Sequence, residues 1–151
     1  IHEVGGNAKM SEFQAAMGLL NLKYFEREIE KRGKVAARYR ENLAGIEGLS
    51  FRPVPEGVRQ NYAYLPVSFD PAAFGATRDE VAETLKQYDI YPRKYFYPIA
   101  SATPCYREQY RPEETPVALR ASERVLTLPM YADLALSDVD DICEVVASCK
   151  R

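Results

Sequence analysis

The sequence contains little of the two residue types that most often bind metals or form cross-links. Its 151 residues include one histidine, His2, and three cysteines, Cys105, Cys143 and Cys149. An odd number of cysteines without a CxxC pair predicts neither a disulfide scaffold nor a zinc site, and we expect no bound metal. A single histidine far from any candidate nucleophile argues against a nucleophilic triad. Free thiols indicate a reducing compartment, so we expect a cytoplasmic protein.

Long apolar runs and an excess of positive charge are also absent. The chain carries 20 lysines and arginines against 22 acidic residues, a formal net charge of −2. Because it has no global positive field, we expect neither nucleic acid nor an anionic membrane as a partner. No stretch approaches the roughly 20 apolar residues that a membrane-spanning helix needs. The composition, 46% hydrophobic and 28% charged, is that of an ordinary globular protein.

The N-terminus shows no targeting signal. The first residue is Ile1 rather than methionine, and no charged segment followed by an apolar one comes after it. We therefore expect the sequence to begin inside a longer protein. Its length allows one domain with a core, or a small domain with an extension that packs on something else.

A long helix is predicted from Ser11 to about Leu43. Ser11 and Gln14 have the spacing of a capping box, which marks a helix start. In the first half of the segment apolar side chains occupy more than one face, whereas after Phe25 they narrow to one stripe. We expect the first half to be buried against another domain or subunit, because the rest of the chain is too small to cover it.

Glycines and prolines between residues 45 and 57 mark the passage into a second unit. We therefore divide the chain into an N-terminal turn with the long helix, residues 1–45, and a small C-terminal α/β domain, residues 46–151. In the second unit we predict strands at 61–70 and 89–97 and helices from Thr77, near 117–126, and from Ser137 to about Ser148. This order predicts a small sheet covered by helices.

Two details of the second unit are specific enough to test. Pro66 inside the first strand predicts an edge strand or a bulge, because proline cannot donate to the sheet. The helix that begins at Thr77 should turn Val81, Leu85 and Tyr88 toward the core.

A candidate anion site precedes the long helix. Gly5 and Gly6 allow close approach of the backbone, Asn7 offers an amide donor and Lys9 a cation, beside the free N–H groups of a helix start. An alternative interpretation is an ordinary turn before a helix with Lys9 in solvent. The chemistry alone leaves both open.

A second candidate site is the segment Arg93-Lys94-Tyr95-Phe96-Tyr97-Pro98, in which cations and phenols alternate. In an extended strand Arg93, Tyr95 and Tyr97 would share one side. Such a face could bind a nucleotide-sugar through charge to the diphosphate and stacking or hydrogen bonds to the sugar and base. Aromatic residues that pack on the core at an exposed strand end are the alternative.

The stretch from Gly6 to Leu19, GNAKMSEFQAAMGL, resembles the G-N-x-[RK]-M-x-E-x-Q-A-A-x-G-L signature of the DegT/DnrJ/StrS sugar aminotransferases. Residues 31–43, 93–107 and 121–131 resemble three further family patterns: an R-x-x-x-A-x-x-Y helix, an aromatic and proline-rich substrate loop, and an A-x-x-x-L-x-L-P-x-Y ending. The resemblance covers nearly the whole chain.

This resemblance implies the C-terminal domain of a fold type I pyridoxal-phosphate enzyme, homodimeric, that moves an amino group from glutamate to a nucleotide-linked keto-sugar. The lysine that forms the Schiff base with the cofactor lies upstream of the signature in this family, so no catalytic residue is assigned here and the chain alone should be inactive. By the same resemblance Asn7 would reach the phosphate of the partner subunit's cofactor. Lys9 stands where arginine is usual, and Arg93, Tyr95 and Tyr97 fall in the substrate loop.

Two other functions remain open at this stage. Some relatives are sugar dehydratases with histidine in place of the lysine, and the residue that decides lies upstream. A non-catalytic interaction module would instead use the apolar surface between Phe13 and Leu22 to bind a partner protein.

Overall fold

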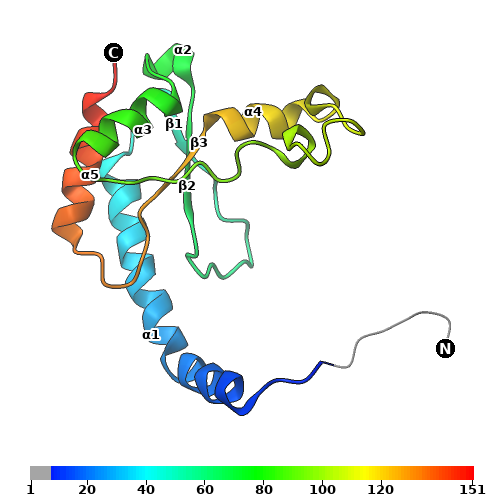
Figure 1. The fold of residues 1–151 in the computed structure, drawn as a ribbon. Coiled ribbons are helices and arrows are strands. Elements are labelled where there is room, and N and C mark those ends of the chain that lie inside the picture. The colour runs from blue at the N-terminus through cyan, green and yellow to red at the C-terminus, as the bar shows by residue number, and fades with distance from the viewer. Residues whose placement is uncertain (1–7) are drawn as a thin grey trace.

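A computed structural model describes residues 8–151, so the turn of Gly5, Gly6 and Asn7 lies outside the described residues. The elements are, in chain order, α1 (Glu12–Asn42), β1 (Leu49–Phe51), β2 (Leu65–Phe69), α2 (Pro71–Phe74), α3 (Arg78–Gln87), the 3-10 turns η1 (Ala100–Ala102) and η2 (Pro112–Glu114), α4 (Pro116–Arg124), β3 (Val125–Leu128) and α5 (Leu136–Ser148) (Figure 1). A long helix followed by a small sheet with helices around it confirms the predicted fold class.

The start of α1 is the predicted capping box. The Ser11 hydroxyl accepts a hydrogen bond from the Gln14 N–H at 3.3 Å, and the Gln14 side chain accepts one from the Ser11 N–H at 2.8 Å. The helix contributes to the core only in its second half, where Ile29, Ala36 and Tyr39 are buried. There it packs along α5, so one helix joins the core to a part of the chain that projects away from it (Figure 1).

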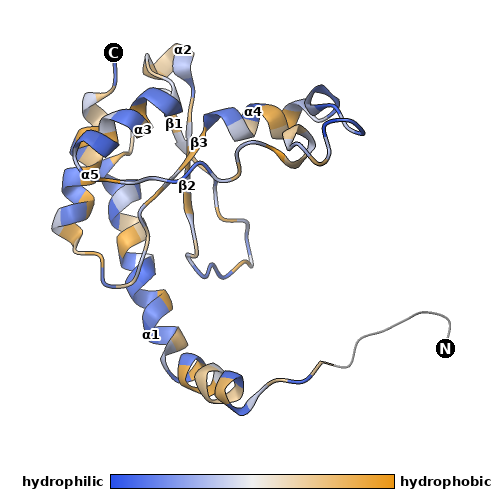
Figure 2. Ribbon diagram, viewed as in Figure 1, coloured by the Kyte–Doolittle hydropathy of each residue, from blue (hydrophilic) through white to orange (hydrophobic). Residues whose placement is uncertain are grey.

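The first half of α1 leaves its apolar side chains in solvent. Phe13 is 87% exposed, although a phenylalanine is usually buried. We call the exposed set the apolar stripe of α1: Met10, Phe13, Met17, Leu19, Leu20 and Leu22. Figure 2 shows hydrophobic residues gathered on these turns, which extend away from the remainder of the protein. Nothing in residues 8–151 covers this stripe, as expected for a surface that meets another domain or subunit.

The core lies between the sheet and the helices. Along β2 the side chains of Leu65, Val67 and Phe69 are buried, in the alternation expected of a strand that covers a core with one face. Val81 and Leu85 of α3 face this core, as predicted. Tyr88 does not: it is the C-cap of α3 and is exposed, because the helix ends one residue earlier.

The sheet is antiparallel with the order β1-β2-β3, so Pro66 lies in the central strand and forms no bulge. Its predicted edge position is therefore wrong, but the reason for the prediction still applies locally. Pro66 faces Thr127 of β3, whose N–H and C=O both bond to Arg93 on the other side. The pair is thus a non-hydrogen-bonded one, and the Pro66 nitrogen points to the opposite side, where β1 has ended at Phe51.

Four predicted elements differ from the structure. The strand expected at 61–70 covers only Leu65–Phe69, and the helix expected to open at Ser137 begins at Leu136, after an N-cap Ala135 that gives no side-chain hydrogen bond. The helix expected near 117–126 ends at Arg124, and the chain continues as β3 because Leu126 and Leu128 are buried beside β2. The strand expected at 89–97 is reduced to one bridge between Arg93 and Thr127. No helix within residues 8–151 combines the length and the apolar character that a membrane span requires.

Candidate functional site

Arg93 and Tyr95 lie together at the outer edge of β3. The Arg93 N–H donates to the Thr127 carbonyl at 2.9 Å, and the Thr127 N–H donates to the Arg93 carbonyl at 2.8 Å. This bridge fixes the backbone of Arg93 against the sheet. The Arg93 guanidinium donates to the Tyr95 hydroxyl at 2.6 Å and lies 5.7 Å from the centre of its ring. One cation and one phenol are therefore held side by side by backbone pairing.

Aromatic rings extend this pair into a small surface. Tyr64 meets Tyr95 edge to face at 5.3 Å between ring centres, and Phe96 stacks on Tyr95 at 4.9 Å. A pocket of about 290 Å³ opens beside them, lined by Ala63, Tyr64, Tyr91, Arg93, Tyr95, Thr127, Leu128, Pro129 and Met130. A guanidinium beside stacked phenol rings can bind an anionic group and a flat ring in one ligand.

Tyr97 lies apart from this pocket. The Tyr97 N–H donates to the Lys94 carbonyl at 2.9 Å, so the chain turns after Lys94 and the strand alternation is lost. The Tyr97 ring instead lies 4.7 Å below the guanidinium carbon of Arg78. The structure thus brings together Arg93 and Tyr95 of the three predicted substrate residues, but not Tyr97.

Residues that the sequence did not single out complete the surroundings. Tyr64, which directly precedes β2, and Met130, in the chain after β3, line the pocket. Arg78 and Asp79, at the start of α3, contact the same segment from behind. The position of Tyr64 on the outer face of the predicted strand was a signal for this residue, whereas Tyr62, expected on the same face, lines a different hollow. No pattern indicated Arg78, because its partners come from other parts of the chain.

Lys9 is exposed in front of α1, two residues before the N-cap Ser11. It takes part in none of the ion pairs found within residues 8–151. Asn7, the other predicted cofactor-binding residue, lies outside the described residues. The first turn of α1 also carries Glu12, whose charge opposes an anion there.

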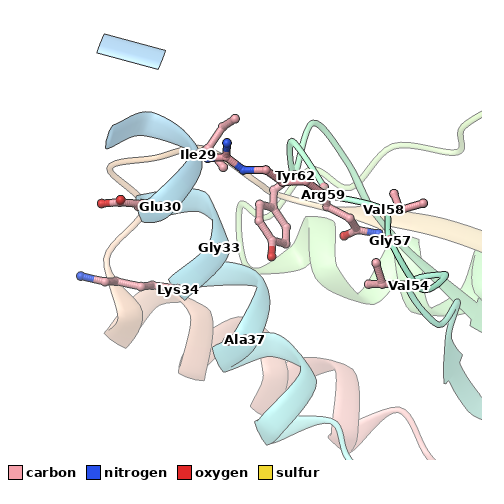
Figure 3. Close-up of a pocket in the computed structure, with 11 residues that line it drawn as sticks. Ile29, Glu30, Gly33, Lys34, Ala37, Val54, Gly57, Val58, Arg59 and Tyr62 are labelled. Atoms are coloured by element: carbon pink, nitrogen blue, oxygen red, sulfur yellow. The ribbon is translucent and has the colours of Figure 1, made fainter. Parts of the chain in front are cut away.

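A larger hollow of the described chain lies elsewhere, between α1 and residues 54–62. It has a volume of about 860 Å³ and is walled by Gly33 and Ala37 on the helix and by Val54 and Val58 opposite. Figure 3 shows Tyr62 projecting between the two walls, while Glu30 and Lys34 extend away from the opposite wall. A side chain at residue 33 would crowd the Tyr62 ring, because a Cβ there would lie 3.2 Å from it.

Metal-binding clusters do not occur in the described part of the chain. No three histidine, cysteine, aspartate or glutamate side chains among residues 8–151 are placed to hold one ion.

Comparison with solved structures shows which class of protein has this architecture. The structure of DesI in the presence of its TDP-sugar product superposes with a TM-score of 0.86 at 35% sequence identity. The match covers 96% of this chain and 37% of that one. The long helix and small sheet are thus the arrangement found in an aminotransferase fold of the pyridoxal-phosphate type.

The sequence gives the family directly. The chain belongs to the DegT/DnrJ/EryC1/StrS aminotransferase family, whose model matches residues 1–147. The dTDP-4-amino-4,6-dideoxy-D-glucose transaminase of Escherichia coli is 40% identical over 132 residues, which are 86% of this chain and 35% of that protein. The enzyme of the same name from Shigella dysenteriae is 34% identical over the whole chain and 40% of its own length. The chain thus spans 35–40% of these relatives.

Proposed function

We propose that this chain is the C-terminal part of a cytoplasmic, pyridoxal-phosphate-dependent aminotransferase that transfers an amino group from glutamate to a nucleotide-linked keto-sugar. The observation that carries the proposal is the family match together with the pocket beside Arg93 and Tyr95. Two relatives are named for an amino sugar linked to dTDP, which supports a nucleotide-linked sugar as the substrate class. Their names as transaminases also favour amino transfer over dehydration.

The substrate would bind along the edge of β3. Arg93 is exposed and presents a charged fork that matches two phosphate oxygens of a diphosphate. The rings of Tyr64 and Tyr95 offer faces and edges for the base or the sugar, and the Tyr95 hydroxyl can accept as well as donate. Tyr97, turned toward Arg78, would support this surface from the side instead of entering it.

From this chain, Asn7 and Lys9 would bind the phosphate of the cofactor. The fit of the described residues is partial, since they offer one exposed ammonium and the open N–H groups at the start of α1 beside the acidic Glu12. Such a set can add to a phosphate site built mainly by other donors, but it does not build one alone. Pyridoxal phosphate, when bound, supplies the electron sink for the transfer. This chain's own residues bind and orient, and we assign no catalytic residue to it.

The apolar stripe of α1 would be covered by the remainder of the protein and by the second copy of a homodimer. In the full-length protein, Phe13→Asp would bury a charge in that interface and is expected to shift the molecular mass in sedimentation from dimer to monomer. Val117→Asp is the matched control, because Val117 is equally exposed, at 82%, but lies on α4. A dimer unchanged by Phe13→Asp would contradict this assignment of the stripe.

The activity is tested on the full-length protein and on this chain in parallel. Each is incubated with pyridoxal phosphate, glutamate and the dTDP-linked 4-keto-sugar, and formation of 2-oxoglutarate is measured. We expect turnover by the full-length protein and none by the chain, which lacks the Schiff-base lysine. Turnover by the chain alone, or none by either sample, would overturn the proposal.

A further inference from the structure

Residues at the start of α3 contact the segment Arg93–Pro98 through Lys94 and Tyr97, which do not line the pocket. The Asp79 carboxylate lies 2.6 Å from the Lys94 ammonium, and the same oxygen accepts a hydrogen bond from the Arg78 Nε at 2.6 Å. The Arg78 guanidinium in turn covers the ring of Tyr97. Two residues on the rear of the segment are thus tied to two consecutive residues of one helix.

These contacts are anchored to the sheet. The Arg78 side chain is 1% exposed and donates through Nη1 to the Val125 carbonyl at 2.9 Å, at the first residue of β3. A buried guanidinium that donates two hydrogen bonds and lies over an aromatic ring has little freedom to move. Burial alone would raise the pKa of Asp79, but the hydrogen bond from Lys94 and the charge of Arg78 lower it below its usual value. The carboxylate therefore stays charged and keeps both ties.

The front of the same segment faces the pocket. Arg93 is held by its backbone bridge to Thr127, and its side chain reaches Tyr95. Lys94 and Tyr97 therefore fix the rear while Arg93 and Tyr95 remain available in front. Without these ties the segment would keep its backbone bridge at Arg93 and the ring contact between Tyr95 and Tyr64.

We propose that Arg78 and Asp79 are positioning residues, which hold the Arg93–Pro98 segment so that Arg93 and Tyr95 are set toward the nucleotide-sugar before it binds. This inference rests on the proposed function, because it gives the segment a ligand. Groups held in their binding geometry need no ordering when the ligand arrives, so affinity is gained without any new contact. Neither Arg78 nor Asp79 lines the pocket.

The test compares three variants of the full-length protein. Lys94→Met removes one tie and leaves the pair between the buried Arg78 and the exposed Asp79 intact, whereas Asp79→Asn weakens both ties. Glu83→Gln is the matched control, since Glu83 pairs with Lys86 at 2.7 Å on the same helix without touching the segment. Two quantities are measured: hydrogen exchange of the peptide spanning residues 91–99 without ligand, and the dissociation constant of dTDP by calorimetry.

We expect faster exchange of this peptide in Lys94→Met and Asp79→Asn, and a dTDP dissociation constant raised about tenfold. Glu83→Gln should match the wild type in both measurements. Unchanged exchange in the two variants, or an equal loss of affinity in the control, would overturn the positioning role. If wild-type protein fails to bind dTDP, the proposed function fails, while the exchange rates still decide whether the ties hold the segment.

Discussion

Replacing Tyr39 by phenylalanine should stabilise this protein. Tyr39 is fully buried, and its hydroxyl has no hydrogen-bond partner among residues 8–151. A buried hydroxyl without a partner costs about 1–3 kcal/mol relative to one in water. Phenylalanine keeps the ring in the core and removes only the oxygen, so the cavity left is small. We expect Tyr39→Phe to raise the free energy of unfolding by about 1–2 kcal/mol.

The measurement is urea unfolding followed by circular dichroism, together with a thermal melt. For a chain of this size about 1 kcal/mol corresponds to about 2–4 °C in the melting temperature. The slope against urea should not change, because the surface exposed on unfolding is nearly the same. Tyr88→Phe is the control, since the Tyr88 ring is exposed and its replacement should have no effect. A destabilised Tyr39→Phe protein would refute the reasoning, because it would mean that the hydroxyl is bonded.

Four further results are expected. Burial raises the pKa of Tyr39 far above its ordinary value, so near pH 10 this side chain ionises only in the unfolded chain. The free energy of unfolding should therefore fall as the pH rises above about 10. Alkaline unfolding curves should show a less steep fall in Tyr39→Phe. Gly48→Ala should cost about 3 kcal/mol or more in urea unfolding, because φ is +80° and the new Cβ would lie 2.3 Å from the Phe74 nitrogen. Gly57→Ala, with φ +75° and open space, isolates the backbone cost at about 1–2 kcal/mol. In the full-length protein, Arg93→Lys should raise KM for the nucleotide-sugar about tenfold at unchanged kcat, because the lysine ammonium cannot donate two parallel hydrogen bonds as the guanidinium does. A changed kcat at constant KM would contradict binding as the role of Arg93.

Local signals predicted the helix starts at Ser11 and Thr77 and failed where distant residues decide. The capping boxes at Ser11 and Thr77 could be recognised in the sequence because each involves two residues three positions apart, and both occur in the structure. Residues 125–126 continue a helical pattern, yet they form β3 because β2 offers backbone partners there. Propensity gives way to such pairing in short segments.

The candidate site was predicted in part for the same reason. Arg93 and Tyr95 share a side because the one bridge at Thr127 keeps the chain extended there, and the turn at Lys94 then removes Tyr97 from that side. The buried Arg78 could not be foreseen, since an arginine after a capping threonine is ordinarily in solvent. Its acceptor on Val125 is 47 positions away in the chain.

One missing hydrogen-bond donor determines where a strand stops. Beyond Phe51, the next residue of β1 would pair with Pro66, which has no N–H to offer. The carbonyl of Arg52 accepts instead from the Arg40 side chain on α1, at 3.4 Å. The chain therefore leaves the sheet at this residue and runs beside α1, where it forms the far wall of the hollow lined by Gly33 and Tyr62. A longer β1 would leave less chain to form that wall, so Pro66 in the sheet helps to set how much of the chain faces α1 across the hollow.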